Sequence, residues 1–398
     1  MRLTLQAKLL PTEEQTRPLA ATQQQYVQLC NYLSELVLQT RVTNPHSMYY
    51  IFNRDLRYMF PDLPSALHTC ARAKVAGAYR SRITKYKRRV QQGRKSNSMI
   101  NPCRFKDNST VDYNKLCYSI VNFERVETEH VSVAGACSAV RLSIATIAGR
   151  VKVDALLPNV TINRMGSWTQ ATLTYRKDTK TWYFLVAVEV AEPQLQEYNQ
   201  YLGVDLGIIN IATTSDGEIY SGAVIDNKRA KYYTHVRKLQ KCNTRSARRR
   251  LSSIRRRMSN FIRTTNHTIA QLIVTAAQRS GACLVLEELK HLHASLKARK
   301  PQRMRMFGWS YAQLRDYICY KAKLLGISVM LVDPQYSSQT CRMCGHTERA
   351  NRHGEEFRCK MCDHVDHADV NAAINLATLG MLADHYQNQG LTAPAYSR

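Results

Sequence analysis

The sequence of 398 residues lacks any apolar run of the roughly 18 to 20 residues that a membrane-spanning helix needs. Its first residues, 1–8, alternate polar and apolar side chains and lack the apolar core of a secretory signal. It also contains no internal repeat and no long low-complexity tract. We therefore expect an intracellular, cytoplasmic protein with no membrane partner.

Acidic residues are scarce. The chain has 30 Asp and Glu against 57 Lys and Arg, which gives a formal net charge of +27 and a sequence pI near 9.8. An excess of this size predicts a polyanionic partner. Hydrophobic residues make up 44% of the chain, which excludes a disordered basic tail. The length is typical of two or three domains with substantial cores.

Cysteines are used in two ways. Eight of the twelve are scattered singly, as expected for small buried apolar residues in a reducing compartment. The other four form two Cys-x-x-Cys pairs separated by fourteen residues, a spacing typical of a tetrahedral structural zinc site. Two disulfides are the alternative, and His346 and His364 flank the pairs as competing ligands. The predicted zinc ligands are Cys341, Cys344, Cys359 and Cys362.

The first half of the chain predicts a helical segment inserted into a sheet. Residues 12–95 have helical periodicity, with one helix over 13–38 that Thr12 caps and another over 66–95. Alternating runs at 117–122, 150–156, 169–175 and 182–190 predict strands of a small sheet or barrel. The opening strand, 2–8, needs partners and is expected to pair with that sheet.

The second half predicts a different domain. Strands at 201–205, 208–213 and 218–222 precede a long helical region, 228–279, and a strand at 282–287 follows. A helix at 308–325, a strand at 327–332 and a helix at 367–384 complete the pattern. Three strands followed by alternating helix and strand is the order of an RNase H-like α/β domain.

Three acids stand at the ends of these elements. Asp205 and Glu287 end apolar strands, and Asp369 opens the last helix. Carboxylates that converge in this way repel one another, and two divalent cations would relieve that repulsion while activating water for phosphodiester hydrolysis. Hard oxygen ligands favour Mg²⁺ or Mn²⁺. The alternatives are a turn residue for Asp205 and a helix cap for Asp369, and Glu288 and Asp366 are local competitors.

Four stretches in this order resemble the TnpB family of transposon-encoded nucleases, which are relatives of Cas12. They carry Gly203-Val204-Asp205-Leu206-Gly207, Leu284 to Leu289, Trp309 to Cys341, and His367 to Asn375. The cysteine pairs lie between the third and fourth stretches, and the resemblance covers about residues 200–380. The chain departs from the family at Asp363, where Gly is frequent, and at His367-Ala368, where an Asp-Arg pair is frequent.

The resemblance implies a multidomain α+β and α/β fold. An N-terminal β-barrel, or wedge, of residues 1–11 and 96–196 would hold the helical recognition lobe, 12–95. Residues 197–398 would form an RNase H-like (RuvC) nuclease domain with a zinc ribbon, 336–366, inserted. It also implies that Asp205, Glu287 and Asp369 are the catalytic acids that hold two Mg²⁺ or Mn²⁺ ions.

The same resemblance implies an RNA-guided DNA endonuclease that cuts next to a short target-adjacent motif. Its partners would be a guide RNA derived from the transposon end, double-stranded target DNA and the displaced single strand. We expect a monomer with its RNA, associated with the nucleoid when bound to DNA. A compact Cas12-type CRISPR effector and a cleavage-inactive RNA-guided repressor are the alternatives within this group. A generic basic RNA-binding protein with a zinc ribbon is a third.

Two stretches carry much of the positive charge. Residues 66–95 hold ten basic side chains and residues 228–265 hold fourteen, with no acid in either. A guide RNA and its heteroduplex would neutralise them, whereas the alternative is a solvated face. Aromatic residues among them either stack on bases or belong to the core. A basic segment at 297–305 is a candidate lid. The predicted nucleic-acid-binding residues are Arg80, Arg82, Lys85, Lys87, Arg88, Arg89, Arg248, Arg249, Arg250, Arg255, Arg256 and Arg257.

Overall fold

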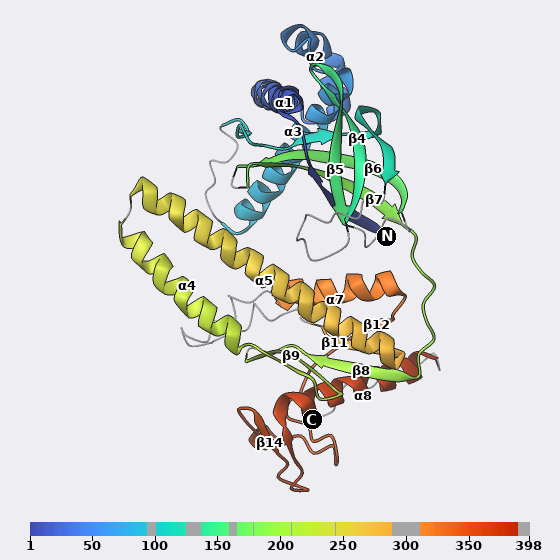
Figure 1. Ribbon diagram of the computed structural model, residues 1–398. Helices are drawn as coiled ribbons and strands as arrows, with labels where there is room; N and C mark the ends of the chain where they lie inside the picture. The colour runs from blue at the N-terminus through green and yellow to red at the C-terminus, as the bar shows by residue number, and fades with distance from the viewer. Residues whose placement is uncertain are drawn as a thin grey trace. The chain divides into compact units, whose positions relative to one another are not determined.

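The computed structural model describes residues 1–93, 101–124, 137–158, 165–177, 179–207, 209–242, 244–288 and 311–388 (Figure 1). The chain forms two compact units, Met1–Ala191 and Glu192–Arg398. No described helix is both long and apolar enough to cross a membrane.

Three helices follow the opening strand of the first unit. They are α1 (Glu13–Thr40), α2 (Pro45–Met59) and α3 (Ser65–Gln91). Thr12 caps α1 as predicted: its side chain accepts the Gln15 amide at 3.3 Å, and the Gln15 side chain accepts the Thr12 amide at 3.0 Å. The sequence prediction did not separate α2, although Asn44 caps it and Pro45 occupies its first position.

The strands of the first unit form one sheet in the order β2-β6-β7-β1-β5-β4-β3. Their bounds are β1 (Arg2–Leu9), β2 (Val111–Tyr113), β3 (Tyr118–Glu124), β4 (Cys137–Thr146), β5 (Gly149–Pro158), β6 (Met165–Arg176) and β7 (Thr181–Val190). The opening strand β1 lies between β5 and β7, which the sequence places after the helices. The helical segment is therefore an insertion between neighbouring strands, as predicted.

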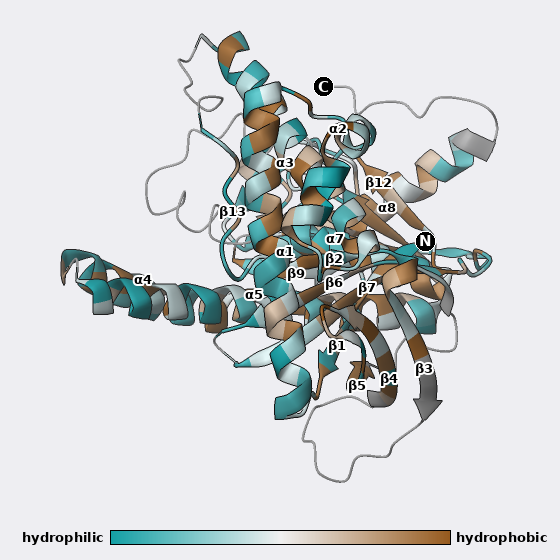
Figure 2. Cartoon of the chain, turned by 90° about the horizontal axis from the view of Figure 1, so that it is seen from above, coloured by the Kyte–Doolittle hydropathy of each residue, from teal (hydrophilic) through white to brown (hydrophobic). Residues whose placement is uncertain are grey.

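This sheet curves until it is nearly closed. Tyr113 on edge strand β2 and Tyr118 on edge strand β3 both pack on the ring of Phe184, with centroids 5.6 Å and 5.3 Å away. Phe184 lies on β7 in the interior of the sheet, so both edges reach the same core side chain. Both hydrophilic and hydrophobic residues occur along the strands of this sheet (Figure 2). The prediction of a barrel-like sheet is confirmed.

The second unit contains a sheet in the order β10-β9-β8-β11-β12. The strands are β8 (Gln200–Asp205), β9 (Asn210–Thr214), β10 (Ile219–Ser221), β11 (Ala282–Glu287) and β12 (Val329–Val332). The first three are antiparallel, whereas β11 runs parallel to β8 and β12. This is the RNase H-like arrangement that the order of elements predicted.

Helices cover both faces of this sheet. Buried side chains of α5 (Arg245–Ser280) and α7 (Tyr311–Leu325) pack against Leu202, Val204, Leu284 and Leu286 on one face. On the other face, α8 (Ala368–Asn388) packs against Val285. The predicted long helical region is two helices, α4 (Ala223–Cys242) and α5, because Thr244 caps a new helix by accepting the Ala247 amide.

A small antiparallel sheet, β13 (Arg352–His353), β14 (Glu356–Arg358) and β15 (Val365–His367), precedes α8. It belongs to the cysteine ribbon, and α8 begins directly after β15. The helix that covers the larger sheet is therefore attached to the ribbon with no intervening loop.

We expect Gly203→Ala to destabilise the second unit. A Cβ on Gly203 would lie 1.9 Å from the Ala373 carbonyl oxygen, so β8 and α8 would have to move apart. Overpacking of this kind costs about 1 to 3 kcal/mol of unfolding free energy, measured by guanidinium denaturation. Gly77→Ala, in helix α3, is the control. A Cβ there meets nothing within 4 Å, and the substitution should raise the unfolding free energy by about 0.5 to 1 kcal/mol. An unchanged midpoint for Gly203→Ala would contradict this packing.

Candidate active site and zinc ribbon

Strand register brings two of the predicted acids together. Asp205 is the last residue of β8 and Glu287 the last of β11, and the strands pair in parallel up to Val204 and Leu286. Side chains alternate along a strand, so both acids lie on the same face as Gly203 and Val285, the face covered by α8. Asp369 is the second residue of that helix. Each acid thus approaches the others from a separate element.

The three carboxyl groups interact. The pKa of Asp205 is held well above its ordinary value, first by burial, then by the charge of Glu287 and a side-chain hydrogen bond with it, and also by the charge of Asp369. Glu287 and Asp369 are themselves buried. Burial and neighbouring negative charge both oppose ionisation of a carboxyl group, so the site favours the neutral form of Asp205.

Neighbouring donors hold the acids in place. The Leu206 amide donates to Glu287 Oε1 at 3.2 Å, and Asn210 Nδ2 donates to Asp369 Oδ2 at 2.9 Å. Arg352 of the ribbon pairs with the other Asp369 oxygen, Oδ1, at 2.6 Å. Its positive charge also lowers the pKa of Asp205, which partly offsets the effects that raise it. The site is therefore an acidic centre with one cation at its edge.

Three polar residues of this site were missed in the sequence. Asn210 opens β9, and its amide donates to both Asp369 and Glu355 Oε1, the latter at 3.2 Å. Arg352 and Glu355 come from the ribbon, where charged residues have no distinctive pattern. Of the competing acids, Asp366 is paired with Arg342 at 2.7 Å instead. The buried position of Asn210 in a strand was a signal, because a buried amide needs partners.

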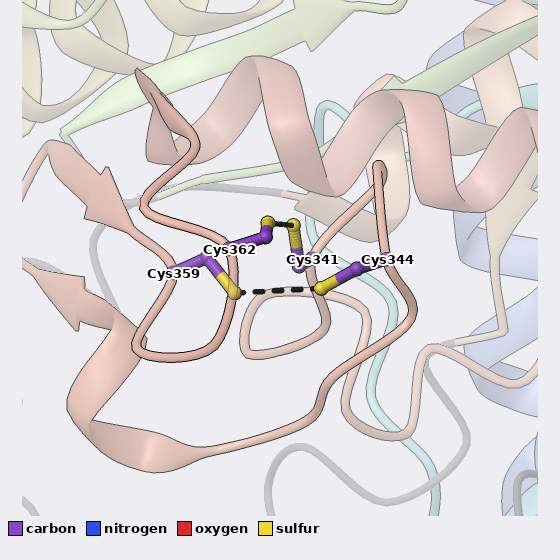
Figure 3. Close-up of side chains that lie close together, drawn as sticks. All are labelled: Cys341, Cys344, Cys359 and Cys362. Atoms are coloured by element: carbon purple, nitrogen blue, oxygen red, sulfur yellow. Dashed lines mark hydrogen bonds between the residues drawn. The ribbon is translucent and has the colours of Figure 1, made fainter.

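The four predicted zinc ligands meet at one point (Figure 3). Cys341 Sγ lies 3.7 Å from Cys362 Sγ, and Cys344 Sγ lies 3.6 Å from Cys359 Sγ. Zinc–sulfur bonds of about 2.3 Å in a tetrahedron place sulfurs about 3.8 Å apart, whereas a disulfide needs about 2.05 Å. The cluster fits a structural zinc ion. Among the described residues, no other group of His, Cys, Asp or Glu ligand atoms is as compact, so the three carboxylates are more widely spaced.

Buried asparagines join the ribbon to itself and to α8. Asn351 donates to the Gln339 carbonyl at 2.9 Å and accepts the Lys360 amide at 3.0 Å, linking the two cysteine pairs. Asn371 and Asn375 on α8 both donate to the Thr340 carbonyl at 2.8 Å, next to the first ligand. The helix that carries Asp369 is thus bonded to the backbone of the zinc loop.

The predicted cationic residues lie on two helices in different units. On α3, most of the named side chains are exposed, whereas Arg82 is half-buried, donates to the Asn101 carbonyl and lies over the Tyr79 ring. Tyr79 itself is buried and donates to Ser34, so it belongs to the core. All six arginines named on α5 are exposed. The candidate lid at 297–305 lies outside the described residues.

Two family profiles match parts of the chain. Residues 183–290 match the family described as "Probable transposase" (OrfB_IS605), and residues 311–376 match "Cas12f1-like, TNB domain". Both lie mainly in the second unit. Together they span the two strand ends and the helix start that carry the three acids.

Named relatives agree with these profiles. Cas12f1 of Sulfoacidibacillus thermotolerans, a "CRISPR-associated endodeoxyribonuclease", is 29% identical over 49% of this chain and 50% of its own. An Escherichia coli protein named "Putative RNA-guided DNA endonuclease InsQ" is 26% identical over 52% of this chain and 56% of its own. The "TnpB-like protein MJ0751" of Methanocaldococcus jannaschii is 29% identical over 28% and 40%. The chain spans about half the length of the first two relatives.

Solved structures share the fold. The cryo-EM structure of a Cas12f1–sgRNA–target DNA complex aligns with a TM-score of 0.56 at 14% identity, over 92% of this chain and 83% of that one. CasPhi-2 (Cas12j) bound to crRNA aligns with a TM-score of 0.53 at 10% identity, over 100% and 99%. These likenesses show that the chain shares the fold of compact Cas12 proteins. The family profiles and the named relatives together support a TnpB-family protein.

We expect Cys341→Ser to reduce the zinc content of the purified protein below one equivalent and to destabilise the ribbon and α8. Three thiolates and a hydroxyl bind zinc far more weakly than four thiolates, and Asn371 and Asn375 would lose an ordered partner. Elemental analysis measures the zinc, and thermal unfolding measures the stability. Cys242→Ser, at an exposed free cysteine, is the control. Full zinc content in Cys341→Ser would contradict the assignment.

Proposed function

We propose that this protein is an RNA-guided DNA endonuclease that cuts target DNA next to a short target-adjacent motif. Asp205, Glu287 and Asp369 would hold two Mg²⁺ or Mn²⁺ ions and hydrolyse the phosphodiester bond. The observation that carries the proposal is the convergence of three carboxylates: the pKa of Asp205 is raised first by burial and then by the charges of Glu287 and Asp369. An unliganded acidic cluster of this kind is costly to the fold, and a divalent cation removes the cost.

Divalent ions bound here would activate a water molecule and stabilise the leaving oxygen of the cleaved strand. The protein's own residues prepare the site for them. Asn210 fixes one oxygen of Asp369, and the Leu206 amide fixes one oxygen of Glu287, so both acids are oriented before an ion arrives. Arg352 pairs with the other Asp369 oxygen, so a positive charge lies beside the acids and could contact a phosphate bound there.

The guide and target are proposed from the relatives and from the charge. Two of the relatives above are named as endonucleases, one as CRISPR-associated and one as putatively RNA-guided, and the two stretches of 66–95 and 228–265 offer cations to phosphates. We propose residues 1–11 and 96–196 as the wedge, 12–95 as the recognition lobe and 197–398 as the nuclease domain with the 336–366 ribbon. The guide RNA would derive from the transposon end, and the complex would contain one protein chain.

A compact Cas12-type CRISPR effector is the second candidate. The match of residues 311–376 to the Cas12f1-like domain favours it. A repressor without cleavage is disfavoured because all three acids are present and the pKa of Asp205 responds to both of the others. Sequencing the RNA that copurifies with the protein from its own host distinguishes the transposon-guided endonuclease from the CRISPR effector, since a transposon end and a CRISPR repeat differ in sequence.

Asp205→Ala should abolish DNA cleavage and leave guide RNA binding intact. Changing a residue that only supports a metal ligand typically lowers activity by roughly 10- to 100-fold. Removing a carboxylate from the metal site itself should lower the cleavage rate by well over that factor. The rate is measured with Mg²⁺ on plasmid DNA that carries the target. Asp363→Asn, at an exposed acid of the ribbon, removes the same charge and should cleave normally. Cleavage by Asp205→Ala at the wild-type rate would refute the catalytic assignment.

Stability should depend on pH and Mg²⁺ together. Because the pKa of Asp205 is raised in the folded protein, the folded state keeps a proton that the unfolded chain has lost. Without metal, stability should therefore fall as pH rises from the ordinary carboxyl range toward the raised pKa. Mg²⁺ binds the deprotonated form, so it should raise the melting temperature more at pH 8 than at pH 6. An equal Mg²⁺ effect at both values, or its persistence in Asp205→Asn, would contradict this.

A further inference from the structure

A groove lies between α4 and α5 in the second unit. It has a volume of about 380 Å³, which falls in the range of ligand pockets, roughly 300 to 1,000 Å³. One stripe of each helix lines it. Positions 228, 231, 232 and 235 follow the three- and four-residue steps of one face of α4, and positions 250, 254, 257, 258 and 261 do so on α5.

The groove has an apolar floor and a cationic rim. Tyr232, Ile254, Met258 and Phe261 are half-buried and form the floor. The exposed rim consists of Lys228, Lys231, His235, Arg250 and Arg257.

No acid lines the groove, and the four Lys and Arg side chains of the rim have no ion-pair partner among the described residues. Lys228 lies over the Phe261 ring, with its Nζ 3.7 Å from the centroid. A ligand that carries both a flat apolar surface and a negative charge would satisfy both parts of the groove.

We propose that this groove holds one unpaired nucleotide of the guide RNA. Its base would lie on the floor with Tyr232 and Phe261, and its flanking phosphates would contact the rim. The inference rests on the proposed function, which supplies the RNA. A base within a duplex is stacked on its neighbours and is unavailable to an apolar floor, so the occupant must be a bulge, loop or single-stranded segment.

His235 favours RNA over DNA. Its Nδ1 lies 2.8 Å from the Lys231 carbonyl oxygen, which only accepts, so Nδ1 carries the proton. In the neutral ring, Nε2 is then an acceptor at the rim. A ribose 2′-hydroxyl donates to such an acceptor, and DNA has no equivalent group. The rim therefore offers phosphate contacts that either nucleic acid would satisfy and one acceptor for which the 2′-hydroxyl of RNA is an additional donor.

The test is a binding assay on the full chain after removal of copurified nucleic acid. The probes are fluorescent decamers: single-stranded oligouridylate, the same length of oligodeoxyuridylate, and an RNA duplex. The wild type should bind oligouridylate about two- to tenfold more tightly than oligodeoxyuridylate, as one hydrogen bond provides. Ile254→Trp fills the groove and should weaken oligouridylate binding about five- to hundredfold, the contribution of one stacked base. Binding of the duplex should not change.

Ser252→Trp is the matched control, because it adds the same ring at an exposed α5 position outside the groove and should leave all three affinities unchanged. Tyr232→Ala removes part of the floor without overpacking, and thermal melting checks that both groove variants fold. The salt dependence gives a second readout. Loss of the base contact should leave its slope unaltered, whereas Lys231→Gln should reduce the slope by about one.

An equal loss of duplex and single-strand binding in Ile254→Trp would overturn the proposal, as would no loss at all. A loss confined to oligodeoxyuridylate would assign the groove to a DNA strand and overturn the RNA occupant. Because cleavage is not measured, the outcome is separate from that of Asp205→Ala. If the protein is a nuclease but the groove proposal is wrong, Asp205→Ala abolishes cleavage and Ile254→Trp leaves oligouridylate binding unchanged. If the groove holds RNA but the protein is not a nuclease, Ile254→Trp weakens oligouridylate binding and the wild type does not cleave DNA.

Discussion

Mutual repulsion among three carboxylates is the constraint around which the second unit is arranged. The parallel register of β8 and β11 and the start of α8 bring Asp205, Glu287 and Asp369 together. Three neighbouring donors stabilise this charge: the Leu206 amide, the Asn210 side chain and Arg352. The hydrophobic layers on both faces of the sheet supply the burial that holds the acids in place. The divalent cations that we propose for this site would relieve such a concentration of negative charge at the end of a well-packed sheet.

The zinc ribbon is part of the same arrangement. It sends Arg352 to Asp369 and is held to α8 by Asn371 and Asn375, which donate to the carbonyl next to the first ligand. Since α8 begins directly after the last ribbon strand, order in the cysteine cluster and the position of Asp369 depend on the same short segment. A structural ion that closes the four thiolates would therefore also fix the third acid, at a distance from the chemistry.

The sequence predicted most of what is local. The two cysteine pairs, the Thr12 cap and the three acids at the ends of elements follow from spacing and periodicity, and the RNase H-like order follows from the succession of strands and helices. What escaped depends on tertiary contacts. Asn210, Arg352 and Glu355 join the site through residues far away in the chain. The strand β4 was not named from the sequence, although Val140, Leu142 and Ile144 alternate with less apolar residues and are buried. The joint between α4 and α5 was missed because basic residues continue through it.

The positively charged residues of the protein are arranged differently from the three acids of the site. Two of the three acids of the site, Glu287 and Asp369, are buried and held by named donors, whereas the cations of α5 are many and exposed. Exposed cations bind phosphates without regard to sequence, and their contribution falls with salt. They provide affinity but do not fix which nucleotide lies at which position.

A site that holds one base, with apolar contacts insensitive to salt, would fix that position. The α4–α5 groove combines both kinds of contact on one helical hairpin, where Lys228 lies directly over the Phe261 ring. Holding an RNA at a fixed nucleotide is a different task from neutralising it, and it requires the half-buried aromatic floor that a merely solvated basic face would not need.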